Sequence, residues 1–207
     1  MAVDLRTIVD PATTAVLTME LQRGVTGDLA AMQDLAKEVA AAGVIDNVAR
    51  LCRAARTAGA KVVHCTAVHR PDHLGSKVNS RIQAAAIKLN QGRLDLGQPG
   101  VEIMPEIGPE PSDVEVPRFH GMTPFTSTSL DQILRNMGIT TVIGTGNSVN
   151  IGVIGMVMSA VDLGYQVVVP RDAVAGVPQD YAEAVLQHTV AMLATVVTTD
   201  DVIAAWG

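Results

Sequence analysis

The chain has 207 residues, of which 48% are hydrophobic, 17% charged and 2% aromatic, and its formal net charge is −6. This acidic balance argues against a nucleic-acid-binding protein, and the few aromatic rings argue against stacking on bases. The most apolar stretch, residues 151–161, is far shorter than the roughly 20 residues that span a bilayer. Two cysteines are too few for a disulfide framework. We therefore expect one cytoplasmic domain over residues 1–207, with neither a nucleic-acid nor a membrane partner.

Short runs rich in valine and isoleucine predict β-strands along the chain. None of them alternates cleanly between apolar and polar residues, which is typical of strands covered on both faces in a parallel sheet. The predicted strands lie at residues 15–19, 61–65, 140–144, 166–169 and 195–198.

Apolar residues at helical spacing connect these strands at residues 45–55, 130–137, 152–163 and 182–192. Thr128 or Ser129 can cap the second of these helices. Strands that alternate with helices predict an α/β fold, a three-layer α/β/α sandwich around a mainly parallel, doubly wound, Rossmann-like sheet. Residues 71–117 fit this pattern poorly and contain many prolines, so we expect a long excursion that covers the active site.

In an open α/β sheet, ligands bind outside the carboxyl ends of the strands, so the residues that follow each strand are candidates for function. Glu20 and Gln22 follow the first strand, and Arg118 and His120 follow the excursion. The strand at 140–144 is followed by residues 145–152, which lead into a helix, and the backbone of residues 146–152 is a candidate for binding an oxyanion or a carboxylate.

Four segments in this order resemble the isochorismatase-like hydrolases, a superfamily that includes nicotinamidases and other amidohydrolases of small molecules. They are residues 14–22, 118–130, 138–153 and 162–173, and the resemblance extends over nearly the whole chain. The resemblance implies the isochorismatase-like sandwich, a small-molecule substrate, no cofactor, and assembly into a homodimer or homotetramer.

The family's catalytic Asp, Lys and Cys fall on Glu20, Arg118 and Gly152. Gly152 has no side chain, so a covalent thiol mechanism at this position is excluded. Isochorismate-cleaving members of the family also carry glycine here and protonate a vinyl ether, although they typically have His where this chain has Asn150. The resemblance therefore implies a hydrolase of a small, anionic molecule that uses Glu20 as a general acid.

Arg118 can either neutralise Glu20 or bind a substrate carboxylate.

The family often has a cis peptide bond in the nucleophile loop, which maps to Asn147–Ser148. The predicted substrate-binding residues are Gln22, His120, Phe125, Asn147, Ser148, Asn150 and Ile151.

Other interpretations stay open. A salt bridge between Glu20 and Arg118 would favour a family member without activity, acting as a small-molecule-binding or structural protein. Cys65, near the end of a strand, is a weak candidate for a displaced nucleophile.

Two further motifs are incomplete. His69 and His73 have the spacing of a metal-binding pair, but Ala67 stands where metal-binding nicotinamidases carry an Asp ligand, so we expect no metal. A dinucleotide-binding motif beginning at residue 144 lacks its third glycine, because position 149 is valine.

Overall fold

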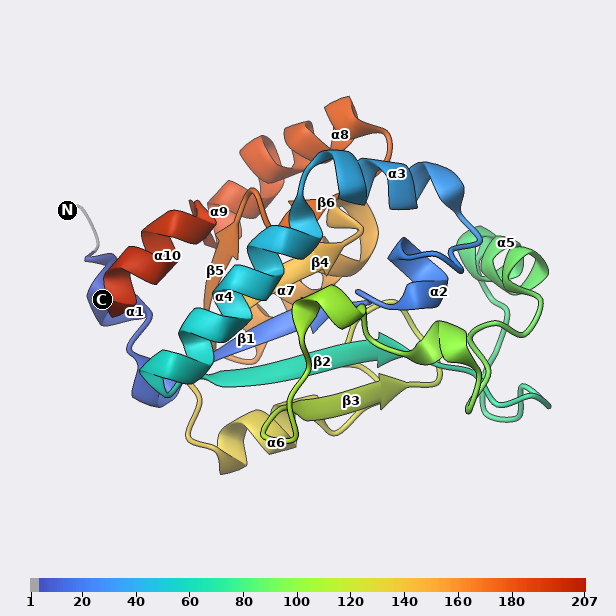
Figure 1. Ribbon diagram of the computed structural model, residues 1–207, viewed down its shortest axis with the longest axis horizontal. Coiled ribbons are helices and arrows are strands. Elements are labelled where there is room, and N and C mark those ends of the chain that lie inside the picture. The colour runs from blue at the N-terminus through green and yellow to red at the C-terminus, as the bar shows by residue number, and fades with distance from the viewer. Residues whose placement is uncertain (1–3) are drawn as a thin grey trace.

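A parallel β-sheet forms the centre of the computed structural model, which describes residues 4–207 (Figure 1). The strand order is β3-β2-β1-β4-β5-β7, and β6 pairs with the end of β4. The bounds are β1 (Thr14–Met19), β2 (Lys61–Ala67), β3 (Val114–Arg118), β4 (Thr141–Asn147), β5 (Gln166–Pro170), β6 (Val174–Ala175) and β7 (Thr195–Val197). The predicted parallel, doubly wound sheet is confirmed.

Helices cover both faces of the sheet, as expected for strands buried on both sides. On one face lie α1 (Leu5–Ile8), α3 (Gln33–Ala41), α4 (Val44–Ala58) and α10 (Thr199–Trp206). On the other face lie α6 (Leu130–Asn136), α7 (Ile154–Asp162) and α8 (Gln179–Val185). The remaining helices are α2 (Arg23–Thr26), α5 (Arg81–Asn90) and α9 (Ala191–Leu193).

Each face has its own hydrophobic core, and β1 contributes to both. Val16 packs in the cluster beneath α4, whereas Leu17 and Met19 pack in the cluster with α6 and α7.

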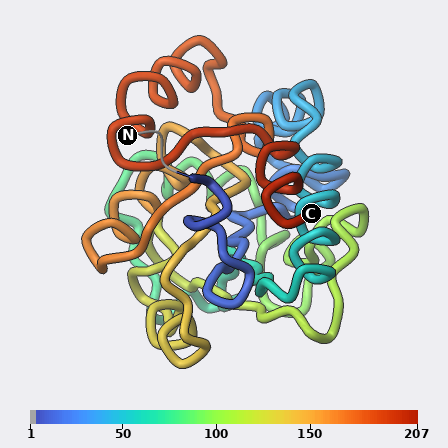
Figure 2. Tube along the Cα trace, turned by 90° about the vertical axis from the view of Figure 1, so that its left-hand side faces the viewer, coloured from blue at the N-terminus to red at the C-terminus, as the bar shows by residue number. Residues whose placement is uncertain are grey.

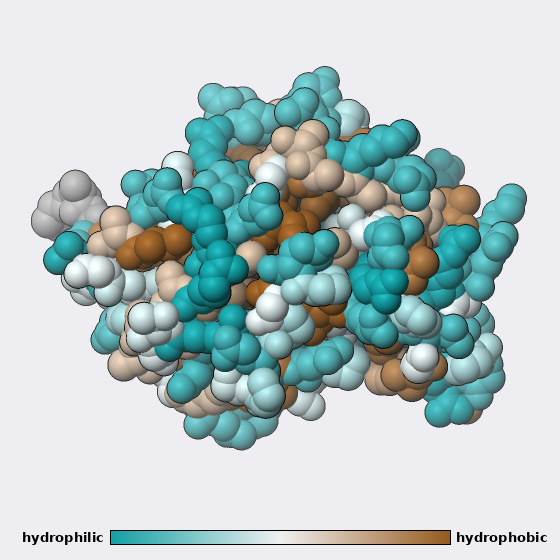
Figure 3. All heavy atoms as spheres, viewed as in Figure 1, coloured by the Kyte–Doolittle hydropathy of each residue, from teal (hydrophilic) through white to brown (hydrophobic). Residues whose placement is uncertain are grey.

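On the face shown in Figure 3, hydrophilic side chains cover most of the surface and hydrophobic ones show mainly in the middle of the view. No helix among residues 4–207 is long and apolar enough to cross a membrane.

The two ends of the described chain meet on the α4 face. Figure 2 shows α10 beside the N-terminal segment, and Trp206 Nε1 donates a hydrogen bond of 2.7 Å to the carbonyl oxygen of Val9. This contact fixes α10 against α1 and stabilises the edge of the sandwich away from the carboxyl ends of the strands.

The excursion at residues 71–117 contains structure that the apolar pattern did not reveal. It holds α5, two short 3₁₀ turns and most of β3, an edge strand whose exposed Pro117 is tolerated because an edge strand has no further neighbour.

The predicted helix at 152–163 begins instead as a π-helical turn, Val149–Val153, which continues into α7. Of the two predicted caps of α6, Ser129 is the N-cap residue but makes no side-chain cap hydrogen bond, whereas Thr128 Oγ1 accepts from the Leu130 N–H at 3.1 Å.

A buried polar network joins β1, β2 and α4. Thr18 Oγ1 lies 2.8 Å from His64 Nδ1, and His64 Nε2 lies 3.1 Å from Asp113 Oδ2. Arg56 of α4 donates to both oxygens of the same carboxylate, at 3.0 and 2.7 Å. Burial lowers the pKa of His64 and outweighs Asp113, which acts in the opposite direction. His64 is therefore neutral, donating from Nε2 to Asp113 and accepting from Thr18.

We predict that the free energy of unfolding falls as the pH drops below the ordinary histidine pKa of 6.5. The pKa of His64 is lower in the folded than in the unfolded chain, so the unfolded chain takes up the proton first. The stabilisation is complete above pH 6.5 and is lost as the pH falls towards the folded pKa. Urea unfolding from about pH 8 to about pH 5 measures this slope.

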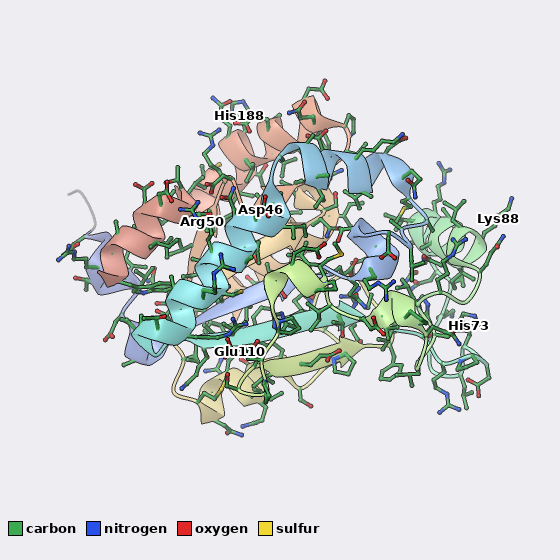
Figure 4. All side chains as sticks on the ribbon, in the orientation of Figure 1. Asp46, Arg50, His73, Lys88, Glu110 and His188 are labelled. Atoms are coloured by element: carbon green, nitrogen blue, oxygen red, sulfur yellow. The ribbon has the colours of Figure 1, made fainter. Side chains whose placement is uncertain are left out.

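His64→Gln should flatten the slope, because glutamine does not titrate. Burial also lowers the pKa of His69, which keeps part of the slope in this variant. His188→Gln is the matched control, since His188 is exposed on the surface (Figure 4). An equal slope in the two variants would contradict the prediction.

Candidate functional site

The carboxyl ends of β1, β3 and β4 meet around one open cavity. From β1 the chain adds strands in one direction, to β2 and β3, and then returns to place β4 on the other side of β1. This reversal is the topological switch point at which open α/β sheets bind ligands. Glu20, Arg118 and Gly152 all line the cavity there.

Glu20 is held in an unusual backbone conformation. Its φ of 53° lies in the left-handed region, which is uncommon for a residue with a side chain. The Glu20 N–H donates to the carbonyl oxygen of Cys65 at 2.9 Å, and Asn147 Nδ2 donates to the carbonyl oxygens of Met19 and Glu20 at 3.3 and 3.2 Å. Such locally strained residues cluster at functional sites, where the surrounding contacts hold them in place.

Glu20 and Arg118 form an ion pair through Glu20 Oε1 and Arg118 Nη2. The Arg118 side chain is only 6% exposed and the Glu20 side chain 21%, so the pair is largely removed from water. Arg118 Nε donates to the carbonyl oxygen of Gly121 at 3.0 Å, whereas Nη1 has no hydrogen-bond partner among residues 4–207. The site thus contains one unused guanidinium donor.

Gly152 leaves no room for a side chain unless its neighbour moves. A Cβ atom built on Gly152 would lie 2.9 Å from Met19 Cε and 3.2 Å from the carbonyl oxygen of Asn147. The methionine side chain therefore occupies the space into which a residue at position 152 would extend.

The turn after β4 has the cis peptide bond between Asn147 and Ser148 that the family resemblance implied. The N–H groups of Gly146 and Ile151 donate to the carbonyl oxygens of Ala173 and Ser148, at 2.9 and 3.1 Å. Both N–H groups are occupied within the segment predicted to bind an oxyanion, so neither is available for that role.

The structure brings most of the predicted site residues to the cavity. Those that line it are Glu20, Arg118, His120, Asn147, Ser148, Ile151 and Gly152.

Three predicted substrate-binding residues do not line the cavity, and each has a structural contact instead. Gln22 is fully buried, and its side-chain amide is hydrogen-bonded to the backbone of Ala67 and Val101. The Phe125 ring packs 5.8 Å from that of Tyr165. The third, Asn150, donates from Nδ2 to the carbonyl oxygen of residue 177 at 3.2 Å.

The other candidate groups find little support. Cys65 is 1% exposed and burial raises its pKa to about 12, so it carries no reactive thiolate. The rings of His69 and His73 lie 5.6 Å apart, and no group of three potential metal ligands occurs within residues 4–207. Gly144 and Gly146 belong to strand β4 and do not form a phosphate-binding loop.

The excursion supplies cavity residues that the motifs did not indicate. Lys77 lies at the mouth, where its N–H donates to His120 Nδ1 at 3.3 Å, and Ser76 donates to the carbonyl oxygen of Phe119. Ile82 and Ile87 of α5 form part of the wall. The only sequence signal for these residues was their position in a long connection after a strand.

The isochorismatase domain model matches residues 14–201. The chain belongs to the isochorismatase family. It is 28% identical over 185 residues to the ureidoacrylate amidohydrolase RutB of Pseudomonas savastanoi pv. phaseolicola, an alignment that covers 84% of this chain and 75% of that protein.

Two solved structures extend this result. An isochorismatase family protein of Burkholderia thailandensis is 28% identical, with a TM-score of 0.77 over 94% of this chain and 96% of that one. The N-carbamoylsarcosine amidase from Thermoplasma acidophilum is 25% identical, with a TM-score of 0.69 over 91% and 97%. The isochorismatase-like fold predicted from the four sequence segments is confirmed.

We predict that Gly152→Ala lowers the free energy of unfolding of this isochorismatase-family protein by about 1–3 kcal/mol, the usual cost of an overpacked core. The cost should be clearly smaller in a Met19→Ala background, because the truncation removes Met19 Cε, the nearest atom to the new Cβ, and leaves only the 3.2 Å contact with the carbonyl oxygen of Asn147. A double-mutant cycle by urea unfolding measures this coupling. Gly155→Ala is the control, since its Cβ would meet Thr123 at 2.8 Å, and its cost should not depend on Met19.

We also predict that Arg118→Met lowers the free energy of unfolding by about 3 kcal/mol, because it leaves a mostly buried carboxylate without its partner. Adding Glu20→Gln should restore much of this loss by removing the uncompensated charge. The exposed pair Arg171–Glu183, with side chains 53% and 51% exposed, provides a control cycle whose coupling should stay below about 1 kcal/mol. Equal coupling in the two cycles would contradict the prediction.

Proposed function

We propose that this isochorismatase-family protein hydrolyses a small, anionic molecule without a thiol, using Glu20 as the general acid. The observation that carries the proposal is the Glu20–Arg118 pair on a cavity at the switch point, beside a glycine where the family has its nucleophile. The relatives named as amidohydrolases support a small-molecule substrate, and the ureidoacrylate in the name of one of them carries a carboxylate.

While Glu20 is paired with Arg118, its Oε1 accepts from the guanidinium and is not available to a substrate. A substrate anion that binds Arg118, with its unused Nη1 donor, competes with Glu20 for the guanidinium. The Glu20 carboxyl group, 21% exposed, is then released from its partner and can act on the substrate as the acid. In this mechanism the anionic substrate both occupies the arginine and prepares the acid, so neutral analogues should be poor substrates.

The remaining cavity residues would position the substrate. His120 lies at the mouth, and Asn147, Ser148 and Ile151 line the wall formed by the turn after β4. Asn147 Oδ1 is buried without a hydrogen-bond partner among residues 4–207, which leaves an acceptor beside Glu20. An acceptor and a guanidinium donor at one end of a cavity suit a ligand that carries both N–H or O–H groups and an anion.

The ion pair also favours a second candidate function, an inactive family member that binds a small molecule. In that case Arg118 and Glu20 serve only to hold the cavity in shape. Ligand binding that raises the melting temperature, with no turnover of vinyl ethers or small amides of any charge, would establish this second function.

We predict that Glu20→Gln lowers kcat for anionic vinyl ethers or small amides by about 100-fold or more, the usual contribution of a general acid. Glutamine keeps the size of the side chain but cannot transfer the proton. Steady-state kinetics on the purified protein measure this effect, with Glu106→Gln, an exposed residue outside the cavity, as control. Wild-type rates in Glu20→Gln would show that Glu20 is not the acid.

A further inference from the structure

The cavity has two chemically different ends. Charged and amide side chains gather at the ends of the strands, whereas the wall away from the strands is aliphatic. The residues of this aliphatic wall are Val25, Met32, Leu35, Ile82, Ile87 and Leu94. A ligand that is polar throughout would leave this wall unused.

Helix α5 supplies part of the wall through one face. Its cavity-lining residues recur at positions 82, 83, 86, 87 and 90, the spacing of a single helical face. The residues between them are exposed, and Lys88 points away from the body of the molecule (Figure 4). No residue of α5 belongs to either hydrophobic core cluster. The half-buried Ile82 and Ile87 therefore face the cavity without a protein core to pack against.

The charge of the lining differs in sign from that of the chain. The whole chain has a net charge of −6, but the cavity is lined by two cationic side chains, Lys77 and Arg118, and one anionic side chain, Glu20. Lys77 has no acidic partner within 4.0 Å in the described part of the chain. The excess positive charge therefore remains for a ligand.

We infer that the ligand is amphipathic, with a carboxylate at the Arg118 end and an unbranched aliphatic body against the face of α5. The inference that this ligand is the substrate of the enzyme rests on the proposed function. The inference that the cavity binds such a ligand does not depend on it. Phe119 and the imidazoles of His69 and His120 are the only rings that line the cavity within residues 4–207, and none of them belongs to the aliphatic wall. The wall therefore favours flexible chains over flat ring systems.

The test uses unreactive straight-chain carboxylates of increasing length, from acetate to octanoate, and measures their dissociation constants by calorimetry. Each methylene that the cavity buries should tighten binding by about fourfold, until the wall is covered. The corresponding alcohols should bind at least about tenfold more weakly, because they lack the charge that Arg118 recognises.

Two neighbouring alanines of α5 provide a matched pair of variants. Ala86 lines the cavity and Ala85 is exposed, so Ala86→Asp and Ala85→Asp place the same carboxylate on opposite sides of one helix. Ala86→Asp should abolish the dependence of affinity on chain length, and Ala85→Asp should preserve it. Both substitutions lower the helix propensity of α5 by the same amount. A difference in ligand affinity between the two variants therefore comes from the contact between the ligand and the aliphatic wall, not from the folding of α5.

Affinity that does not change with chain length, or an equal effect of the two variants, would overturn the inference. The outcome is independent of catalysis, since the probes are not hydrolysed. A fourfold step per methylene together with no turnover would support this inference and overturn the proposed hydrolase. Turnover of short polar anions, together with an affinity for the carboxylates that does not depend on their chain length, would support the proposed hydrolase and overturn this inference.

Discussion

The close contact between β1 and β4 at the centre of the sheet is the constraint on which the site depends. Met19 and Gly146 are paired in register, and a Cβ on Gly146, whose φ is 103°, would lie 2.2 Å from the carbonyl oxygen of Met19. Only glycine allows the two backbones to approach this closely. The next residue of each strand, Glu20 and Asn147, is thereby placed side by side, and the Asn147 amide then fixes the carbonyl of Glu20.

The absence of a nucleophile is a matter of packing as well as of chemistry. Met19 fills the space beside Gly152, so a cysteine introduced there would have to displace a core side chain. The paired Glu20 and Arg118 lie across the same cavity, and both are longer than the Asp and Lys of the family pattern. These positions therefore form one locally consistent arrangement, in which an ion pair lies at the cavity and a methionine occupies the space beside Gly152.

The parallel sheet could be predicted from the sequence because its central strands are short, continuous apolar runs. The core helices could be predicted because their apolar residues recur at helical spacing. Glu20, Arg118 and the residues of the turn after β4 that line the cavity could be placed together because parallel strands all end at the same edge. Gln22 could not be assigned correctly in this way, since its position after β1 does not show that Ala67 and Val101 occupy its amide. Whether Arg118 pairs with Glu20 depends on side-chain geometry across β2, which no local pattern encodes.

The α5 wall was hidden for a different reason. The apolar face of a helix is recognised from its period because the helix buries that face against a core. The face of α5 is short, interrupted by Gln83, and packs on neither core cluster, so its sequence resembles that of a polar connection. A helix that borders a cavity is stabilised only in part by the protein around it, and apolar ligand surface can supply the contacts it lacks. The weakness of the sequence signal and the half-buried isoleucines thus have one cause, an apolar surface that the fold itself does not cover.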